Sequence, residues 1–178
     1  MKLRRPSFQS VFQWGLGVAT GGLLIGLVAS QSIHEANERN LLVELADNHM
    51  RSLLAGHLVD VSSADLRIVR PWFEGKIDFA PPVPDLSATG YTLVGGRMDY
   101  FSGRPAAALV YQLGKHYISV FLWADPSAAN QATQVMRGQR GYDIVGWISN
   151  GVMGRAVSEI SERDLRDFAN AFQTSPQP

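Results

Sequence analysis

An uncharged apolar stretch at residues 11–30 most constrains this chain, since only Gln13, Thr20 and Ser30 are polar there. Twenty helical residues rise about 30 Å, the thickness of the hydrocarbon core of a bilayer. Residues 1–10 carry three basic residues and no acidic one, a bias that keeps a chain end in the cytoplasm. We therefore expect a cytoplasmic tip at 1–10, a transmembrane helix at 11–30 and a single-pass protein of the bacterial inner membrane with its main domain in the periplasm.

The alternative for the same stretch is a cleaved signal peptide, with Val28-Ala29-Ser30 as the cleavage site. The pair Arg4-Arg5 also raises a twin-arginine signal, although Pro6 and the residues after it fit that pattern poorly. The apolar stretch is long for the core of a signal peptide, which favours a retained anchor.

Small residues recur along one face of the predicted membrane helix at spacings of four, three, four and three. Small side chains let a second helix backbone approach closely, which is how membrane helices associate. The alternative is that glycine is simply common in such segments. The candidate partner-binding residues in the membrane are Gly15, Ala19, Gly22, Gly26 and Ala29.

Residues 31–56 have the apolar spacing of a helix, with Leu42, Leu45, Ala46 and Leu53 on one side. We expect a stalk helix that continues the membrane helix, packs on the outer domain and stops at Gly56. The outer domain then occupies residues 57–173, and residues 174–178 form a tail.

The outer domain has the alternation of an antiparallel sheet. Three turn signals, Ser102-Gly103, Gly114-Lys115 and Asn150-Gly151, lie between strand-like runs. The predicted strands are 95–101, 105–113, 116–124, 142–149 and 152–160, with 116–124 central because both of its faces are apolar.

The remaining segments of the outer domain complete the prediction. We expect a short strand-like run at 66–69, an irregular extended loop at the prolines 81–84, and a polar loop at 125–141. A closing helix begins at Ser161. The fold class is therefore α+β, with an N-terminal transmembrane helix and stalk, an antiparallel sheet of about five strands and a C-terminal helix.

Composition excludes several function classes. The chain has no cysteine, so thiolate zinc sites, disulfides and iron–sulfur clusters are excluded, and its formal net charge of zero argues against a nucleic-acid partner. The histidines show no metal-binding spacing and are interpreted as capping or surface residues, and no serine lies in a nucleophile elbow. We therefore expect no catalytic residue, no metal and no cofactor.

Trp72 and Phe73 are two adjacent large aromatics in a predicted loop. They close the open end of the domain's own core, or they form an exposed anchor for a partner, as interface aromatics often do. They are the candidate partner-binding residues of the outer domain.

Several sequence blocks between about residues 49 and 172 belong together: HLVDV at 57–61, VRPWFEGKIDFAPPV at 69–83, DL at 85–86, LVGGRMDY at 93–100, GR at 103–104, AALVY at 107–111, His116, GY at 141–142 and AVS at 156–158. In these blocks the chain resembles the extracytoplasmic region of bacterial transmembrane anti-sigma factors. Members usually begin with a cytoplasmic helical domain, often with a zinc motif, that binds a sigma factor. This chain has about ten residues before its apolar stretch and no cysteine, and it has Arg67 where the family is associated with a histidine. The resemblance therefore implies a fold and a location, and no catalytic residue.

Together these features predict a non-catalytic, membrane-anchored interaction subunit, an accessory chain of a membrane-associated enzyme complex. Its partners would be a membrane protein or enzyme complex, reached through helix packing, and the lipid bilayer; a second copy of the chain is a further candidate. One alternative is a regulator of transcription that resembles anti-sigma factors, and another is a periplasmic enzyme, which would need a polar pocket with perturbed ionisable groups.

Overall fold

The computed structural model describes residues 31–33, 35–54, 56–101 and 103–176, in two units divided after Asn40. In the first unit, residues 31–33 and 35–40 are helical; in the second, residues 41–54 form a helix, and Gly56 follows with a φ of +64°. These helical residues lie inside the range 31–56 that the sequence predicts, and Gly56 has the left-handed backbone of a helix stop. Within the described residues, no helix has both the length and the apolarity needed to cross a membrane. The predicted membrane segment 11–30 lies outside them.

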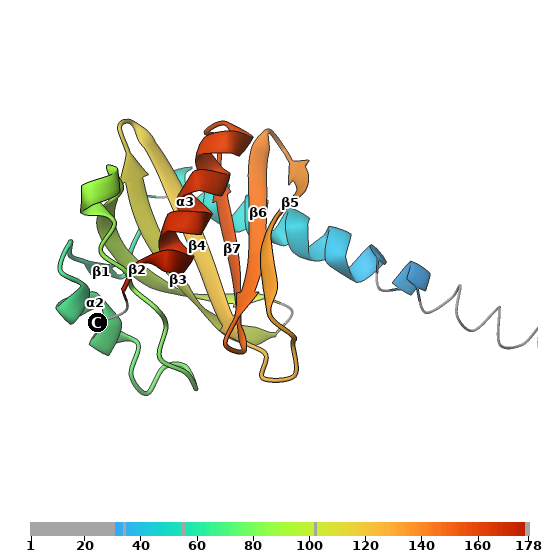
Figure 1. The fold of residues 1–178 in the computed structure, drawn as a ribbon, viewed down its shortest axis with the longest axis horizontal. Coiled ribbons are helices and arrows are strands. Elements are labelled where there is room, and N and C mark those ends of the chain that lie inside the picture. The colour runs from blue at the N-terminus through green and yellow to red at the C-terminus, as the bar shows by residue number, and fades with distance from the viewer. Residues whose placement is uncertain (1–30, 34, 55, 102, 177–178) are drawn as a thin grey trace, which may run out of the picture. The chain divides into compact units, whose positions relative to one another are not determined.

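The second unit is built on an antiparallel sheet of seven strands in the order β1-β2-β3-β4-β7-β6-β5 (Figure 1). The fold class is therefore α+β, as the sequence predicts. The strands are β1 Val61–Ser62, β2 Thr92–Phe101, β3 Arg104–Leu113, β4 His116–Ala124, β5 Gln131–Gln139, β6 Tyr142–Ser149 and β7 Val152–Ser158.

The predicted turns join the predicted strands. Asn150 and Gly151 both have positive φ, +52° and +73°, which a two-residue hairpin between β6 and β7 requires. Gly103 and Gly114 also have positive φ, +76° and +58°, in the turns on either side of β3. Strand β4 lies in the middle of the strand order, as its two apolar faces predict.

Each face of the sheet has its own apolar core. Ile118, Val120 and Leu122 of β4 join the core on the face covered by α3, Glu162–Thr174, whereas Phe121 and Trp123 join the core on the opposite face. Leu42 and Leu45 from helix 41–54 belong to that second core. In Figure 1, α3 crosses one face of the sheet and helix 41–54 lies behind the other.

Helix α3 begins where the sequence predicts. The hydroxyl of Ser161 accepts a hydrogen bond from the amide of Asp164 at 3.2 Å, which caps the first turn. Leu165, Phe168 and Phe172 follow on one buried face. The rings of Phe168 and Phe172 pack on Tyr111 of β3, so the helix is held to the sheet mainly through aromatic contacts.

Two details of the predicted fold are wrong. The range 125–141 is predicted to be a loop, yet it contains β5, a polar strand at the edge of the sheet that pairs with β6 alone. The range 66–69 is predicted to be a strand, yet it lies in the helix α2, Leu66–Trp72. The carboxylate of Asp65 accepts a hydrogen bond from the amide of Arg67 and caps this helix, and Pro71 falls inside its last turn. The sheet therefore has seven strands instead of about five, because β1 and β5 add to those predicted.

Candidate functional site

Segment 70–82 begins in the last turn of α2 and turns after it, and Arg70, Ala80 and Pro82 line a pocket together with residues of α3. The turn is closed by backbone hydrogen bonds from Phe73 to Arg70 and from Glu74 to Pro71, and Gly75 takes a φ of +73°. The prolines within 81–84 lack the amide of a sheet ladder, and this range is irregular, as the sequence predicts.

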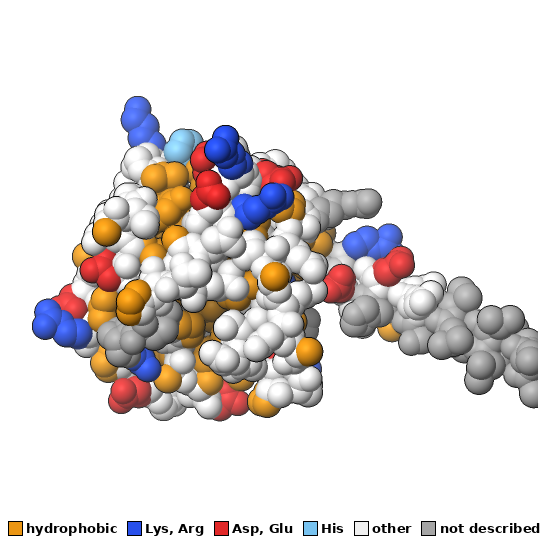
Figure 2. Space-filling model, viewed as in Figure 1, with side chains coloured by type: hydrophobic (Ala, Val, Ile, Leu, Met, Phe, Trp, Pro, Cys, Tyr) orange, Lys and Arg blue, Asp and Glu red, His pale blue; other side chains and the backbone are white. Residues whose placement is uncertain are grey.

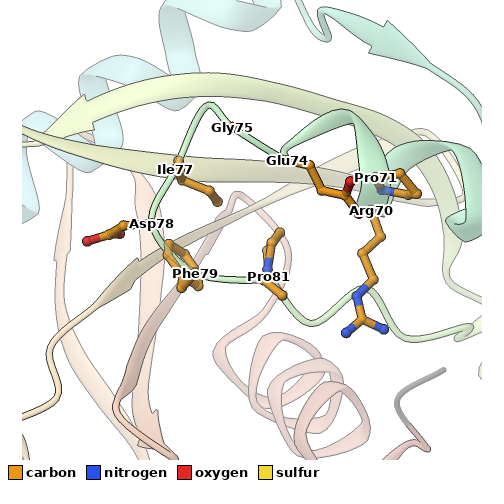
Figure 3. Close-up of a pocket in the computed structure, with 9 residues that line it drawn as sticks. Arg70, Pro71, Glu74, Gly75, Ile77, Asp78, Phe79 and Pro81 are labelled. Atoms are coloured by element: carbon orange, nitrogen blue, oxygen red, sulfur yellow. The ribbon is translucent and has the colours of Figure 1, made fainter.

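Two pockets lie on either side of this segment. The first, of about 590 Å³, is lined by Arg70, Pro71, Ile77, Phe79 and Pro81 together with the acidic residues Glu74 and Asp78. In Figure 3 the ring of Pro81 lies between the ring of Phe79 and the guanidinium of Arg70, while Asp78 lies on the far side of Phe79.

The second pocket, of about 310 Å³, is lined by residues from three distant parts of the chain. Arg70 and Ala80 line it as they line the first pocket, so the two pockets are neighbours on the surface. Trp147 of β6 and Phe172 of α3 form its apolar wall, with Gln173 beside them. Arg70 is the charged residue that lines this pocket.

The two aromatic residues singled out in the sequence behave differently. Phe73 is fully buried, 0% exposed, and its ring packs against Gly96 of β2. The prediction that Phe73 is an exposed anchor for a partner is therefore wrong. Phe73 closes the domain's own core, because the turn after α2 directs its side chain inward. Trp72 is half-buried, with its ring edge-on to Phe73 at 5.1 Å and the Lys76 ammonium 4.4 Å above it. The membrane residues Gly15, Ala19, Gly22, Gly26 and Ala29 lie outside the described residues.

A buried polar cluster lies on the opposite face of the sheet. The Nδ1 atom of His49 lies 2.8 Å from the Ser119 hydroxyl oxygen, and its Nε2 atom lies 3.8 Å from the Glu159 carboxylate. The same carboxylate pairs with Nδ1 of His116 at 2.9 Å. The edge of the Tyr142 ring packs on the imidazole of His49 at 4.9 Å.

This cluster has the residue types of a hydrolase triad, but it lacks access for a substrate. Ser119 and His49 are both 0% exposed, so no carbonyl carbon reaches the serine hydroxyl in this state. Burial, the largest contribution, lowers the pKa of His49 from 6.5 to about 4, with Arg97 acting in the same direction and Glu159 against them. The cluster is therefore a neutral, buried hydrogen-bonded group.

The prediction that every histidine is a capping or surface residue is wrong for His49. It follows Leu42, Leu45 and Ala46 at helical spacing and so continues the apolar face of its helix. The spacing alone could have predicted that His49 is buried. It could not have predicted the contact with Ser119, because that contact depends on the tertiary fold. His57 and His116 are exposed and pair with Asp60 and Glu159, in keeping with the prediction.

A second buried charge pair lies on β2. Arg97, 4% exposed, places its guanidinium 3.3 Å from the carboxylate of Asp99 and donates a hydrogen bond to the carbonyl of Leu58. Burial lowers the pKa of Arg97 and raises that of Asp99, while each partner opposes the shift of the other. The contact with Leu58 ties the chain that follows helix 41–54 to the sheet.

Neither a family model, nor a curated protein, nor a solved structure matches this chain. The resemblance to anti-sigma factors accordingly stays a prediction from the sequence. Over the described part of the chain, no three histidine, aspartate or glutamate side chains meet as a metal site would require. The face shown in Figure 2 carries hydrophobic side chains between charged groups of both signs, and neither sign gathers into a patch there.

Proposed function

We propose that this chain is a non-catalytic interaction subunit, anchored in the membrane by residues 11–30, whose outer domain binds a partner through segment 70–82. The partner would belong to a membrane-associated enzyme complex, for which this chain is an accessory. The anchor and its small-residue face come from the sequence alone, while the surface of the outer domain supplies the structural support.

The observation that supports this proposal is the pair of neighbouring pockets that share Arg70 and Ala80. Apolar walls with one shared cation suit an extended peptide segment better than a compact metabolite, since the two hollows lie side by side along one strip of chain. Phe79 and Pro81 line the first pocket, and Trp147 and Phe172 line the second.

The charges of the pockets indicate which partner segment would fit. Arg70 is the charged residue of the second pocket, whereas in the first pocket it lies together with the acidic residues Glu74 and Asp78. A segment with a carboxylate beside an apolar side chain would place the carboxylate at Arg70 and the apolar group against the half-buried Pro82 and Val152. The proposed partner therefore presents an acidic and apolar extended segment.

The enzyme alternative receives little support from the polar groups that meet in the domain. Ser119, His49 and Glu159 have the right types, but His49 lies on the inner side of helix 41–54, and both it and Ser119 are 0% exposed. The first pocket is lined by Arg70, Glu74 and Asp78 and the second by Arg70 and Ser149, with no histidine in either lining to activate a nucleophile.

Co-purification of the full-length, tagged chain from gently solubilised native membranes tests the proposal. Wild type is expected to recover a stoichiometric partner, and Arg70→Glu is expected to lower that recovery at least tenfold, because it places like charges together. Arg166→Glu is the matched control, since Arg166 lies exposed on α3 and pairs with Glu162 one turn away. Undiminished recovery with Arg70→Glu would show that the partner binds elsewhere.

The sequence resemblance to anti-sigma factors favours the alternative that this chain regulates transcription. The same co-purification experiment distinguishes this alternative from the accessory subunit. Recovery of a sigma factor, or of a cytoplasmic protein that binds one, would place this chain in a regulatory complex. Recovery of an enzyme complex with Met1 still present would support the accessory subunit and the retained anchor together.

A further inference from the structure

The inner side of helix 41–54 carries one histidine among apolar residues. His49 is 0% exposed and lies on the same side of the helix as Leu42 and Leu45, which pack against the sheet. Its own backbone carbonyl accepts a hydrogen bond from the Ser52 hydroxyl at 2.7 Å. A titratable ring therefore lies within the contact that holds this helix to the domain.

The two ring nitrogens of His49 are unequally satisfied. Nδ1 lies 2.8 Å from the Ser119 hydroxyl, but Nε2 is buried and has no hydrogen-bond partner among the described residues. A neutral imidazole needs to donate from one nitrogen only, whereas an imidazolium must donate from both. The nearest acceptor for Nε2, the Glu159 carboxylate, is 3.8 Å away and already pairs with His116. The docked helix therefore fits the neutral ring and not the charged one.

Charged groups around His49 come from each neighbouring part of the fold. The carboxylate of Glu159 attracts a charged imidazole, and the buried guanidinium of Arg97 repels it. These effects partly cancel, so the burial of the ring decides the balance. The titratable groups around His49 are Glu159 after β7, Arg97 on β2 and Tyr142 on β6; His116 of β4 pairs with Glu159, and Asp99 of β2 pairs with Arg97.

We propose that protonation of His49 in acid releases helix 41–54 from the sheet while the core beneath α3 stays intact. We call this pH-dependent contact between His49 and the sheet the latch. The two faces of the sheet have separate cores, so one can open without the other. Helix 41–54 is the first element of this unit, so acid would loosen the unit at its N-terminal end.

The sign of the effect follows from the direction of the pKa shift. In the released helix His49 takes a proton near its ordinary pKa of 6.5, and in the docked helix only near a pKa of about 4. The contribution of the neutral ring to docking is complete above pH 6.5 and is lost as the pH falls toward 4. At pH 5 the opening equilibrium should exceed its value at pH 7.5 by roughly 30-fold.

Amide hydrogen exchange of the full-length chain in detergent, expressed as protection factors at pH 7.5 and pH 5.0, tests the latch. Wild type is expected to lose roughly 30-fold protection in helix 41–54 and far less in α3. His49→Gln is expected to remove this pH dependence, because glutamine does not titrate. His57→Gln is the matched control, since His57 is exposed and pairs with Asp60, and it should behave as wild type. The proposal would be overturned if helix 41–54 of His49→Gln lost as much protection between pH 7.5 and pH 5.0 as it does in wild type. It would also be overturned if α3 of wild type lost as much protection as helix 41–54.

A second measurement covers the case in which His49→Gln does not fold. The imidazole signals of isotope-labelled wild-type chain are followed against pH, and those of His34, His57 and His116 are assigned by single replacement with glutamine. A remaining signal that titrates below pH 5 supports the latch. Titration of that signal near pH 6.5 shows that the buried ring takes a proton freely and overturns it.

Discussion

The ring of Phe73 lies against Gly96, so closely that a methyl group on this glycine would come within 2.8 Å of the ring and 3.3 Å of Val69. Phe73 follows α2 and Gly96 lies in the middle of β2, opposite Leu109 of β3. Because Gly96 has no side chain, β2 leaves room for the ring of Phe73, and this contact holds the beginning of segment 70–82 against the sheet. This contact links the core to the proposed interaction surface.

Replacement of Gly96 by alanine should lower the free energy of unfolding by about 1–3 kcal/mol, because the added methyl group overpacks the contact with the ring. Urea unfolding of the domain measures the change. The matched test is a double-mutant cycle: with Phe73→Leu already present, the cost of Gly96→Ala should shrink, since the shorter side chain leaves room. Independent, additive costs would show that the ring and the glycine do not interact as described.

Ser119→Ala should lower the free energy of unfolding by about 1–3 kcal/mol, because it leaves the buried Nδ1 of His49 without its partner. Thermal or urea unfolding at pH 7.5 measures the loss. Ser62→Ala is the control, since Ser62 is exposed on the short edge strand β1 and should change stability by less than about 0.5 kcal/mol. Equal effects of the two replacements would contradict the importance of the buried contact.

Tyr111→Phe should destabilise the domain by about 1–2 kcal/mol, because the fully buried hydroxyl donates to the carbonyl of Pro84 at 2.9 Å. Burial raises the pKa of this hydroxyl above its ordinary value of 10.0, so folding favours the neutral form. Wild-type stability should therefore fall as the pH rises above 10, and Tyr111→Phe should weaken that fall. Tyr100→Phe, at an exposed tyrosine, is the control for both effects.

The small-residue face predicted for residues 11–30 gives a further test. Gly22→Leu together with Gly26→Leu should release the chain from its membrane partner, because leucine keeps helix backbones apart. Co-purification from gently solubilised membranes measures the release. Gly17→Leu is the control, since residue 17 falls on the opposite side of a helix from that face. Unchanged recovery of the partner by the double variant would remove the membrane contact from the proposal.

The sequence predicts the middle of the sheet well because its signals there are local. Asn150-Gly151 and Gly114 are turns that specify which strands are neighbours, and the alternation in β4 specifies its two faces. Trp123 and Trp147, which lie in the predicted strands 116–124 and 142–149, are both buried. The closing helix follows from its Ser161 cap and its apolar spacing.

The errors occur where distant residues decide the structure. The range 66–69 is too short for its period to separate helix from strand, and the cap at Asp65 decides for α2. Strand β5 has a polar sequence and owes its existence to pairing with β6, including Val135 with Val145. The second pocket brings together Arg70, Trp147 and Phe172, which no local pattern connects.

The strand order affects how quickly the chain can fold. Strands β2, β3 and β4 form one meander and β5, β6 and β7 another, and within the described sheet they meet only along β4 and β7. Residues 125–130 carry the chain from the end of β4 to the far edge, where β5 begins, with the amide of Asp125 donating to the carbonyl of Gly151 on the way. The seam between Ser119 and Val157 is therefore completed only after the second meander has folded back. We expect the closing of this seam to limit the rate of refolding, so lengthening the 125–130 connection should slow refolding more than it weakens the folded state.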